Sequence, residues 1–356
     1  ILTIGELILI TPKITNLGYS NLWTDMSTIL GYASNFQKLI TKLFSNGEQG
    51  FFYDPSDMGT MFQDAAGTIP VTATEQPVGL VLDKSKGSAT GINLHTTDTP
   101  INTTNYSATG TRSGLDITVS QETSGYAAVS LGMPTVVGKT YLLELIAPDL
   151  SGFWVLVSDG LTSDALNRKI AIASALTSRI NTKITLVFTA TAPMSYIHLN
   201  RGSSHNLPVT FKGVSCRVVL GNRAFQTVSA SRPTLQRNAT TGAYYLAFDG
   251  VDDFLQTNNI DFTATDKVTV FTGIRKLSDA ATAVVAELGA DTITVNGTFG
   301  LFAPAGTGFT KFQFLSRGAT GTNYAQTSNT IYNAPISAVL RGIGSIADQN
   351  SKLHVN

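Results

Sequence analysis

The sequence predicts a mainly β protein in which an N-terminal helix and an irregular segment are followed by two antiparallel β-sandwich domains in series. Short runs rich in β-branched and aromatic residues recur between turns of Gly, Pro, Asp and Asn. Hydrophobic residues make up 42% of the chain, enough for packed cores. Its 356 residues allow about two domains of roughly 150 residues each. Charged residues make up only 13%, about half of the usual share of roughly 25%.

The balance of charge excludes some partners. Lys and Arg together number 24, as do Asp and Glu, so the chain has no net charge. Without a basic excess there is no long-range attraction to phosphate backbones or anionic lipid, and we expect no nucleic-acid binding. No stretch approaches the roughly 18 consecutive apolar residues of a membrane span, so none is predicted.

Residues 1–46 form the first predicted segment. The opening residues 1–10 are apolar, but they contain Gly5 and Glu6, lack a basic flank and are followed by no small-residue cleavage site. They therefore do not make a signal peptide. Because the chain begins with Ile1, we expect it to start inside a longer product or after processing of one.

An amphipathic helix is predicted over residues 26–45. Apolar residues fall there at alternating spacings of three and four, which is a heptad seam: Ile29, Tyr32, Phe36, Leu39 and Leu43. Asn46 and Gly47 suit the end of such a helix. Two interpretations stay open, an ordinary helix packed on its own domain, or a three-helix bundle in which the seam contacts other copies of the chain.

Residues 47–92 are short apolar pieces separated by turn residues. The run DPSD that begins at Asp54 is typical turn chemistry, and Pro77 interrupts any long regular element. None of the pieces is long enough to bury a core alone. We therefore expect this segment to gain its order by packing on a neighbouring domain or on a second copy of the chain.

The stretch NGEQGFFYDPSDMGTMFQDAAGTIPVTATEQPVGLVLDKS, residues 46–85, resembles a segment that recurs in structural proteins of tailed bacteriophages. The resemblance implies a virion protein, assembled in the bacterial cytoplasm and extracellular in the mature particle. It implies that the N-terminal part attaches to other virion proteins, and that the chain forms a homotrimer, as many phage fibres do.

Residues 93–220 are expected to form the first sandwich. Strand-like runs lie at 115–119, 126–131, 140–146, 153–157, 183–189, 195–199 and 209–220, with one helix-compatible stretch near 165–180. The runs GKTYLLEL, ITLVFTAT, YIHL and VTFKGVS, in this order and spacing, resemble jelly-roll carbohydrate-binding modules. This resemblance implies the fold much more than it implies sugar binding.

Residues 221–356 are expected to form the second sandwich. The run AYYLAFDGVDDFL resembles an early hairpin of concanavalin-like, laminin-G-type domains, with its turn at Asp249-Gly250. Further strands are expected at 268–274, 283–288, 298–302 and 310–316. Such a domain normally has more strands beyond the point that Asn356 reaches, so we expect this sandwich to be incomplete.

The sequence contains no recognisable catalytic set. A glycoside hydrolase needs two carboxylates, about 5 Å apart in retaining enzymes, whereas Glu122, Glu144 and Glu287 are isolated in the sequence. The histidines form no pair with metal-ligand spacing, and His198, in a strand-like run, is expected to be structural. A single cysteine, Cys216, excludes an intrachain disulfide and is expected in the core. We therefore predict a protein without catalytic activity.

Two kinds of binding site are considered. Loop oxygens suit calcium, and the candidate ligands are Asp249, Asp252 and Asp253, with a plain polar turn and no cofactor as the favoured alternative. Exposed aromatic side chains can stack on sugar rings, and the candidates for glycan contact are Trp154, Tyr196 and Tyr324.

Together these features predict a tail fibre or related appendage, anchored through its N-terminal part and contacting a host surface glycan or other virion subunits through its sandwiches. Two alternatives stay open. One is a purely structural protein of the capsid, collar or tail. The other is a depolymerase of surface polysaccharide whose active site lies outside these residues.

Overall fold

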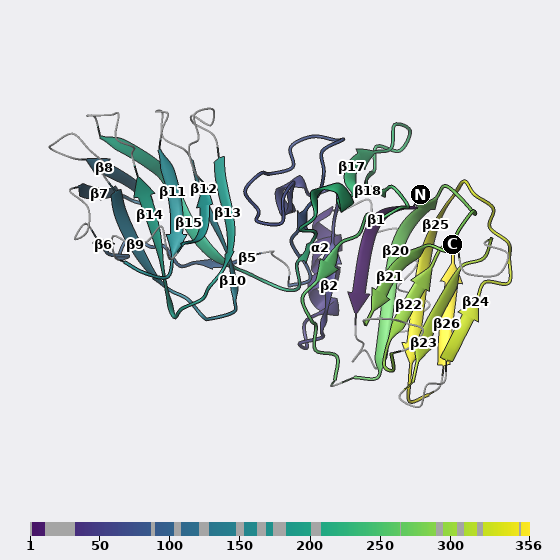
Figure 1. The fold of residues 1–356 in the computed structure, drawn as a ribbon. Helices are drawn as coiled ribbons and strands as arrows, with labels where there is room; N and C mark the ends of the chain where they lie inside the picture. The colour runs from purple at the N-terminus through teal and green to yellow at the C-terminus, as the bar shows by residue number, and fades with distance from the viewer. Residues whose placement is uncertain are drawn as a thin grey trace. The chain divides into compact units, whose positions relative to one another are not determined.

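The computed structural model describes residues 2–10, 33–86, 90–102, 108–120, 128–146, 153–161, 169–173, 183–200, 208–263, 265–289, 295–304, 310–318, 323–348 and 350–356. These residues lie mainly in β-strands, with one α-helix, α2 (Ala33–Leu43), and two short 3-10 helices, η1 (Met58–Thr60) and η2 (Ser229–Ser231) (Figure 1). The predicted mainly β fold class is confirmed. Within these ranges no helix has the length and apolar character to span a membrane.

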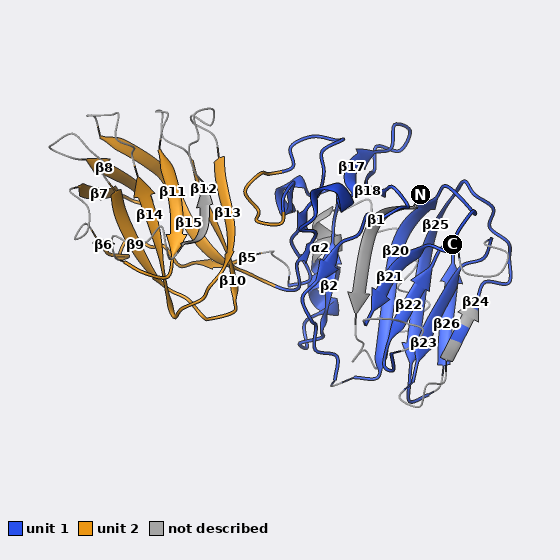
Figure 2. Cartoon of the chain, viewed as in Figure 1, with its two compact units in different colours: residues 1–64, 71–89, 221–356 blue, residues 65–70, 90–220 orange. Residues whose placement is uncertain are grey.

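The chain forms two compact units (Figure 2). Unit 1 consists of residues 1–64, 71–89 and 221–356, and unit 2 of residues 65–70 and 90–220. Unit 2 is thus inserted into unit 1, which corrects the expectation of four consecutive segments with two sandwiches in series. The physical reason is strand pairing, because residues near the N-terminus and residues 80–81 pair with strands that follow residue 221.

A seven-stranded sheet of the described residues forms one layer of unit 1. Its order is β17 (Thr234–Arg237), β18 (Tyr244–Phe248), β1 (Leu2–Ile10), β20 (Lys267–Lys276), β25 (Ile336–Ser345) and β26 (Asn350–Val355), and β2 (Gly50–Tyr53) pairs with β1. Residues 2–4 of β1 pair with β18, residues 7–10 pair with β2, and β1 also pairs with β20. The apolar opening of the chain is therefore an inner strand of this sheet.

A four-stranded sheet packs on one face of this layer. Its order is β21 (Val284–Leu288), β22 (Phe299–Phe302), β23 (Gln313–Arg317) and β24 (Asn323–Thr327), and β23 and β24 approach β25 and β26. A Cβ atom added at Gly342 would lie 2.2 Å from the Phe314 ring, and one at Gly344 would lie 2.6 Å from the Phe299 ring. Glycine at these positions lets the two sheets come together on this side.

Most of the segment predicted at residues 47–92 is built into unit 1, namely residues 47–64 and 71–89, whereas residues 65–70 and 90–92 belong to unit 2. β3 (Met61–Phe62) and β4 (Leu80–Val81) form a small sheet with β16 (Ala224–Phe225) and β19 (Gln256–Thr257). Met61, Val78 and Val81 belong to the same buried core as Leu301 and Leu340 of the sandwich. The segment thus gains its order by packing on strands that follow residue 221.

The predicted hairpin at Asp249-Gly250 does not form. The hairpin partner of β18 is β17, and the N–H of Asn238 donates to the carbonyl of Ala243 in the turn between them. The Asp249 side chain instead accepts the N–H groups of residues 251–253, which closes a local turn. The later predicted strands of this half correspond to β20, β21, β22 and β23.

Unit 2 is a sandwich of two antiparallel sheets. One has the order β13 (Lys183–Thr189), β10 (Thr140–Ile146), β15 (Val209–Val219), β8 (Asp116–Ser120) and β7 (Thr109–Ser113), with β5 (Thr90–Asn93) paired to β15. The other has the order β12 (Lys169–Ala173), β11 (Trp154–Ser158), β14 (Met194–Asn200), β9 (Ala128–Pro134) and β6 (Ile101–Asn102). Leu143, Phe153, Phe211 and the predicted core residue Cys216 lie in one fully buried cluster.

The strands of unit 2 follow the predicted runs closely. β10 and β13 match residues 140–146 and 183–189 at both ends. The helix-compatible stretch near 165–180 is corrected, because its described part, residues 169–173, is strand β12 and pairs with β11. Pairing with a formed sheet outweighs a weak helix propensity.

The described helix α2 covers part of the predicted helix. Ile40, Leu43 and Phe44 are buried, and Leu39 is half-buried. Leu43 is therefore covered within the single chain. The other proposed contacts between chains, Ile29, Tyr32 and the side chain of Phe36, lie outside the described residues.

The carboxylate of Asp83 lies where the chain leaves unit 1 and returns to it. Asp83 is fully buried. One oxygen accepts the N–H groups of Phe52 and Ser85, both at 2.8 Å, and the other accepts the Ser85 hydroxyl at 2.9 Å and the Asn222 N–H at 2.6 Å. Gly221, with φ of +72°, passes so close that a Cβ atom there would lie 2.0 Å from this carboxylate. Burial raises the pKa of Asp83 by more than these hydrogen bonds lower it.

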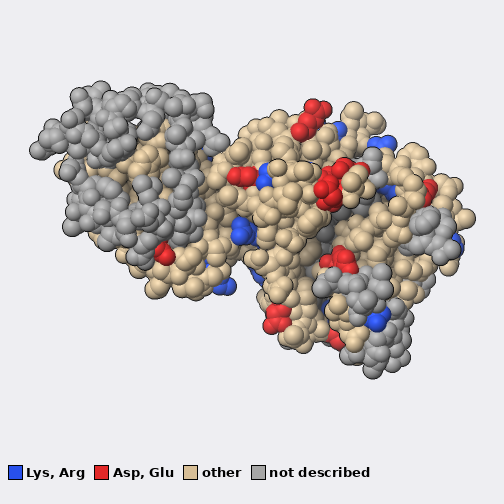
Figure 3. All heavy atoms as spheres, in the orientation of Figure 1, with Lys and Arg blue, Asp and Glu red and all other residues tan. Residues whose placement is uncertain are grey.

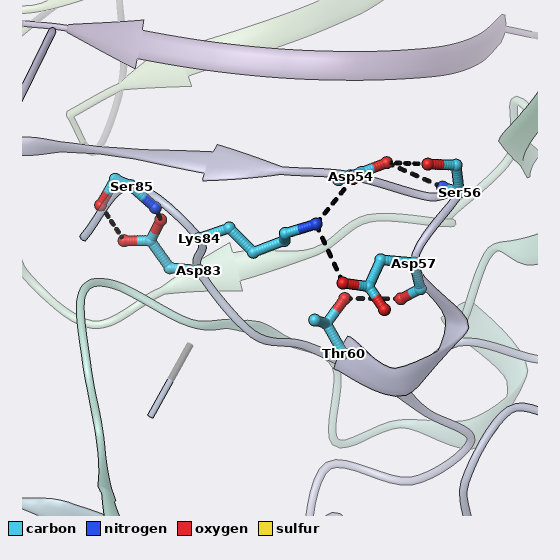
Figure 4. A network of polar contacts seen from close by, with 7 residues as sticks. All are labelled: Asp54, Ser56, Asp57, Thr60, Asp83, Lys84 and Ser85. Atoms are coloured by element: carbon cyan, nitrogen blue, oxygen red, sulfur yellow. Dashed lines mark hydrogen bonds and ion pairs between the residues drawn. The ribbon is translucent and has the colours of Figure 1, made fainter. Parts of the chain in front are cut away.

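The next residue, Lys84, points away from Asp83 and holds the DPSD turn (Figure 4). Its Nζ lies 2.8 Å from Asp54 and 2.9 Å from Asp57. Asp54 also accepts the N–H of Ser56 at 3.0 Å, which confirms the turn chemistry. Burial lowers the pKa of Lys84, but the hydrogen bonds and charges of the two carboxylates outweigh it and raise the pKa.

We expect Asp83→Asn to destabilise unit 1 by about 3 kcal/mol, because the new amide NH₂ group faces donors and leaves buried N–H or O–H groups unpaired. Differential scanning calorimetry measures the loss in the unfolding transition of unit 1. The matched control is Asp57→Asn, which removes one carboxylate from the partly exposed Lys84 pair and is expected to cost less than about 1 kcal/mol. Equal losses in the two variants would contradict the central role of Asp83.

Candidate binding groove

Unit 1 contains a groove of about 1280 Å³ on the side where its two sheets differ in width. The four-stranded sheet approaches the other layer at β25 and β26, whereas the wider sheet continues to β18 and β17. Inner-face residues of β2 and β18 form the floor: Phe51, Tyr53, Leu246 and Phe248. β21, an edge strand among the described residues, forms one wall, and residues 250–263 contribute a second wall.

The floor of the groove is rigid. Phe51 and Tyr53 lie two residues apart on β2, so their side chains share one face. Their rings are stacked, with centroids 4.6 Å apart and an angle of 14° between planes. The Tyr53 hydroxyl donates to the Asn222 carbonyl, and burial, then the charge of Asp83, raises the pKa of Tyr53 well above its ordinary value. Sequence reasoning missed these residues, although the alternation in the run FFY is a signal for one shared face.

The wall formed by residues 250–263 is held from behind. The N–H of Phe254 donates to the Ser231 carbonyl at 3.2 Å, and its carbonyl accepts the side-chain amide of Gln226 at 3.3 Å. The Ser231 hydroxyl also donates to Asp252 at 2.6 Å. The Phe254 side chain is nevertheless 47% exposed, and that of Val251 is 85% exposed. A fixed main chain thus presents apolar side chains to solvent, as binding surfaces do.

Polar side chains complete the groove. Its lining includes amide and hydroxyl groups of residues 250–263 and of three residues outside the two walls: Gln256, Thr257, Asn258, Asn259 and Thr263, then Thr265, Ser278 and Thr282. Figure 3 shows how few charged side chains the visible surface carries, with acidic ones at the border of a hollow in unit 1. An apolar concavity with a limited set of polar groups is the usual form of a ligand site.

The structure brings the three predicted calcium ligands together. Oxygens of Asp249, Asp252 and Asp253 lie within 4.8 Å of one another. Asp249 accepts the N–H of Val251 at 2.8 Å, and Asp253 accepts the N–H of Asp249 at 2.9 Å. The backbone N–H groups that Asp249 accepts, chiefly that of Val251, lower the pKa of Asp249, whereas partial burial raises the pKa of Asp253. The cluster is a self-capped turn, and calcium binding there stays a prediction.

The carboxylate oxygens of Asp249, Asp252 and Asp253 lie within 4.8 Å of one another. The two carboxylates of a retaining glycoside hydrolase have a similar separation, about 5 Å, but this arrangement does not suit catalysis. Asp249 Oδ1 accepts three backbone N–H groups, and Asp252 accepts the Ser231 hydroxyl. Both carboxylates therefore stabilise the turn. Of the carboxylates singled out in the sequence, Glu144 pairs with Lys183 at 2.5 Å, Glu287 lines the β21 wall, and Glu122 lies outside the described residues.

The predicted aromatic contacts lie apart in the described structure. Trp154 and Tyr196 lie on one face of neighbouring strands, β11 and β14, about 13 Å apart along the strand direction. Both are half-buried, and His198 and Ser130 between them are buried. The main chain of Tyr324 lies in β24, and its side chain is outside the described residues. The groove in unit 1 is therefore the better candidate site.

His198 is a structural residue, as predicted. The Ser158 hydroxyl donates to the Gly160 carbonyl at 2.7 Å, so it accepts the Nε2–H of His198, also at 2.7 Å. Nδ1 then accepts the Ser130 hydroxyl at 2.8 Å. Burial lowers the pKa of His198 to about 4. The neutral imidazole therefore joins β9, β11 and β14 through buried hydrogen bonds.

No protein-family model and no curated protein matches the chain. A solved structure titled "CBM4 structure and function" is similar at 13% identity and a TM-score of 0.26, over 33% of this chain and 84% of that one. A family 35 carbohydrate binding module from an environmental isolate is similar at 16% identity and a TM-score of 0.22, over 39% of this chain and 93% of that one. A GH2 beta-galacturonidase from Eisenbergiella tayi bound to glycerol is similar at 8% identity and a TM-score of 0.22, over 75% of this chain and 43% of that one. Two of these proteins are carbohydrate-binding modules, but TM-scores this low carry no argument about function.

We expect unit 2 to lose stability as the pH falls from 6.5 to about 4. In this range the unfolded chain binds a proton at His198 and the folded chain does not, which costs up to about 3 kcal/mol. His95 has a similarly lowered pKa and adds to the loss. His198→Gln removes one titrating group. It is expected to reduce the dependence of the unfolding free energy of unit 2 on pH, which urea denaturation at several pH values measures. His354→Gln, in unit 1, is the control, and an unchanged pH dependence for unit 2 in His198→Gln would show that the histidine is not the cause.

Proposed function

We propose that unit 1 binds a glycan in its groove and that the chain is an adhesive protein. The groove itself is the observation that supports this. The stacked rings of Phe51 and Tyr53 line its floor, and Phe254 stands on a wall rich in amide and hydroxyl groups. Sugar rings have apolar faces that pack on aromatic side chains, and their hydroxyl groups exchange hydrogen bonds with amides. The groove offers both kinds of contact in one concavity.

The proposed activity is binding without catalysis. Asp249 and Asp252 hold the turn beside the groove through hydrogen bonds to backbone N–H groups and to Ser231. Their positions depend on those bonds, so their role is structural and electrostatic. The ligand is then retained and not cleaved.

We further propose a place in a phage particle, as a tail fibre or related appendage that forms a homotrimer. Its ligand would be a host surface glycan, and its partners other virion proteins. The support is the resemblance of residues 46–85 to phage structural proteins and the scarcity of charged residues. Because residues 47–64 and 71–89 belong to unit 1, attachment would use a surface of this folded unit and not a separate module.

We expect Phe254→Ala to weaken glycan binding about tenfold, since it removes roughly 1.4 kcal/mol of apolar contact. The main-chain bonds of Phe254 to Ser231 and Gln226 remain. A glycan array on the full chain identifies the ligand, and isothermal titration calorimetry then gives the affinities. Ile331→Ala is the matched control, because Ile331 is 58% exposed in unit 1 and lies outside the groove lining. Equal affinities of the two variants would place the site elsewhere.

The particle assignment has its own test. We expect light scattering of the purified full chain to give three chains per assembly, and gold-labelled antibodies against the chain to mark an appendage of intact particles in electron micrographs. A monomer in solution would contradict the trimer. Particles without label would contradict the virion assignment and leave glycan binding to be judged on the array.

A further inference from the structure

The groove carries charge of one sign. Among the described residues its lining includes three carboxylates, Asp252, Asp253 and Glu287, and no Lys, Arg or His. They come from both walls, because Asp252 and Asp253 lie in residues 250–263 and Glu287 lies on β21. Asp252 and Asp253 therefore place negative charge at the wall formed by residues 250–263.

One cation behind the wall, Arg232, is bound to backbone carbonyls. Arg232 donates to the carbonyls of Gln226, Gln63 and Thr227, and these bonds hold the main chain that supports the wall. Its charge is directed to backbone oxygens of unit 1. It therefore does not supply a partner for an anion in the groove.

The wall carboxylates are also fixed in position. Asp252 accepts the Ser231 hydroxyl at 2.6 Å, and Asp253 accepts the Asp249 N–H at 2.9 Å. A carboxylate held in this way does not swing away when an anion approaches. Repulsion between like charges is stronger beside an apolar surface than in bulk water, because the local dielectric constant is lower.

We propose that the groove selects uncharged glycans and excludes glycans that carry uronate, sulfate or phosphate groups. This ligand class rests on the glycan binding proposed above. An anionic sugar would bring its charge next to Asp252 and Asp253, and the described lining residues include no cation to pair with it, which is discrimination by repulsion. Neutral hydroxyl groups instead donate to the carboxylates and exchange hydrogen bonds with the amides of Asn258 and Asn259.

The test uses pairs of oligosaccharides that differ only in a carboxylate, such as mannan with mannuronan, galactan with galacturonan, and glucan with glucuronan. Affinities for the full chain are measured by calorimetry at neutral pH and low salt. For the pair that binds, we expect the neutral member to bind at least about tenfold more tightly than the uronate. The preference should shrink as salt is added, because salt screens the repulsion.

The variant that probes the cause is Asp252→Asn with Asp253→Asn. Asparagine keeps a carbonyl oxygen for the bonds from Ser231 and Asp249 and removes both charges. We expect the preference for the neutral member to fall about tenfold. Glu75→Gln with Asp348→Asn removes the same charge from unit 1 outside the groove lining and is expected to leave the preference unchanged.

Each outcome has a separate meaning. A uronate that binds as tightly as its neutral partner, or an unchanged preference in the Asp252→Asn, Asp253→Asn variant, would overturn the charge selection and leave glycan binding standing. Absence of binding to every glycan on the array would overturn the proposed function and the ligand class with it. So would a groove that binds an extended peptide along β21 and no glycan.

Discussion

The buried carboxylate of Asp83 is the constraint on which the organisation of the chain depends. Inserting unit 2 into unit 1 requires the chain to leave and re-enter at positions that the host unit fixes, at an entropic cost of closing the loop. Asp83 fixes both, since it accepts hydrogen bonds from Phe52 and Ser85 on one side and from Asn222 on the other. Gly221 passes beside it where a Cβ atom would not fit.

The groove depends on the same hydrogen bonds. Neighbouring residues of a strand point to opposite faces, so the bond from the Phe52 N–H to Asp83 helps to set the position of β2 as a whole. Phe51 and Tyr53 then form the floor, and the Tyr53 hydroxyl donates to Asn222, whose N–H is also bound to Asp83. One polar cluster therefore fixes the return of the chain and the orientation of the binding surface.

The sequence predicted what local pattern decides. β10 and β13 were predicted with their ends, because alternating apolar residues mark a strand whatever its partner. The central place of β1 and the packing of residues 47–64 and 71–86 in unit 1 could not be predicted, since pairing across more than 200 residues leaves no period in the sequence. The prediction of a hairpin turn at Asp249-Gly250 was wrong for a local reason, because the Asp249 side chain accepts backbone N–H groups of the residues that follow it. The groove was missed because its lining comes from separate segments of the chain.

Because the two sheets differ in width, some residues of the core of unit 1 also line the groove. Phe51 and Tyr53 are only 5% and 8% exposed and belong to the main core of unit 1. Truncating either would cost core packing as well as ligand contact, so the floor has little freedom to change. The wall differs, because Phe254 is held by its main chain while its side chain is exposed. Changes in side chains of residues 250–263 can therefore alter the surface of the groove without unfolding the unit, and the specificity of the proposed glycan binding is expected to vary there.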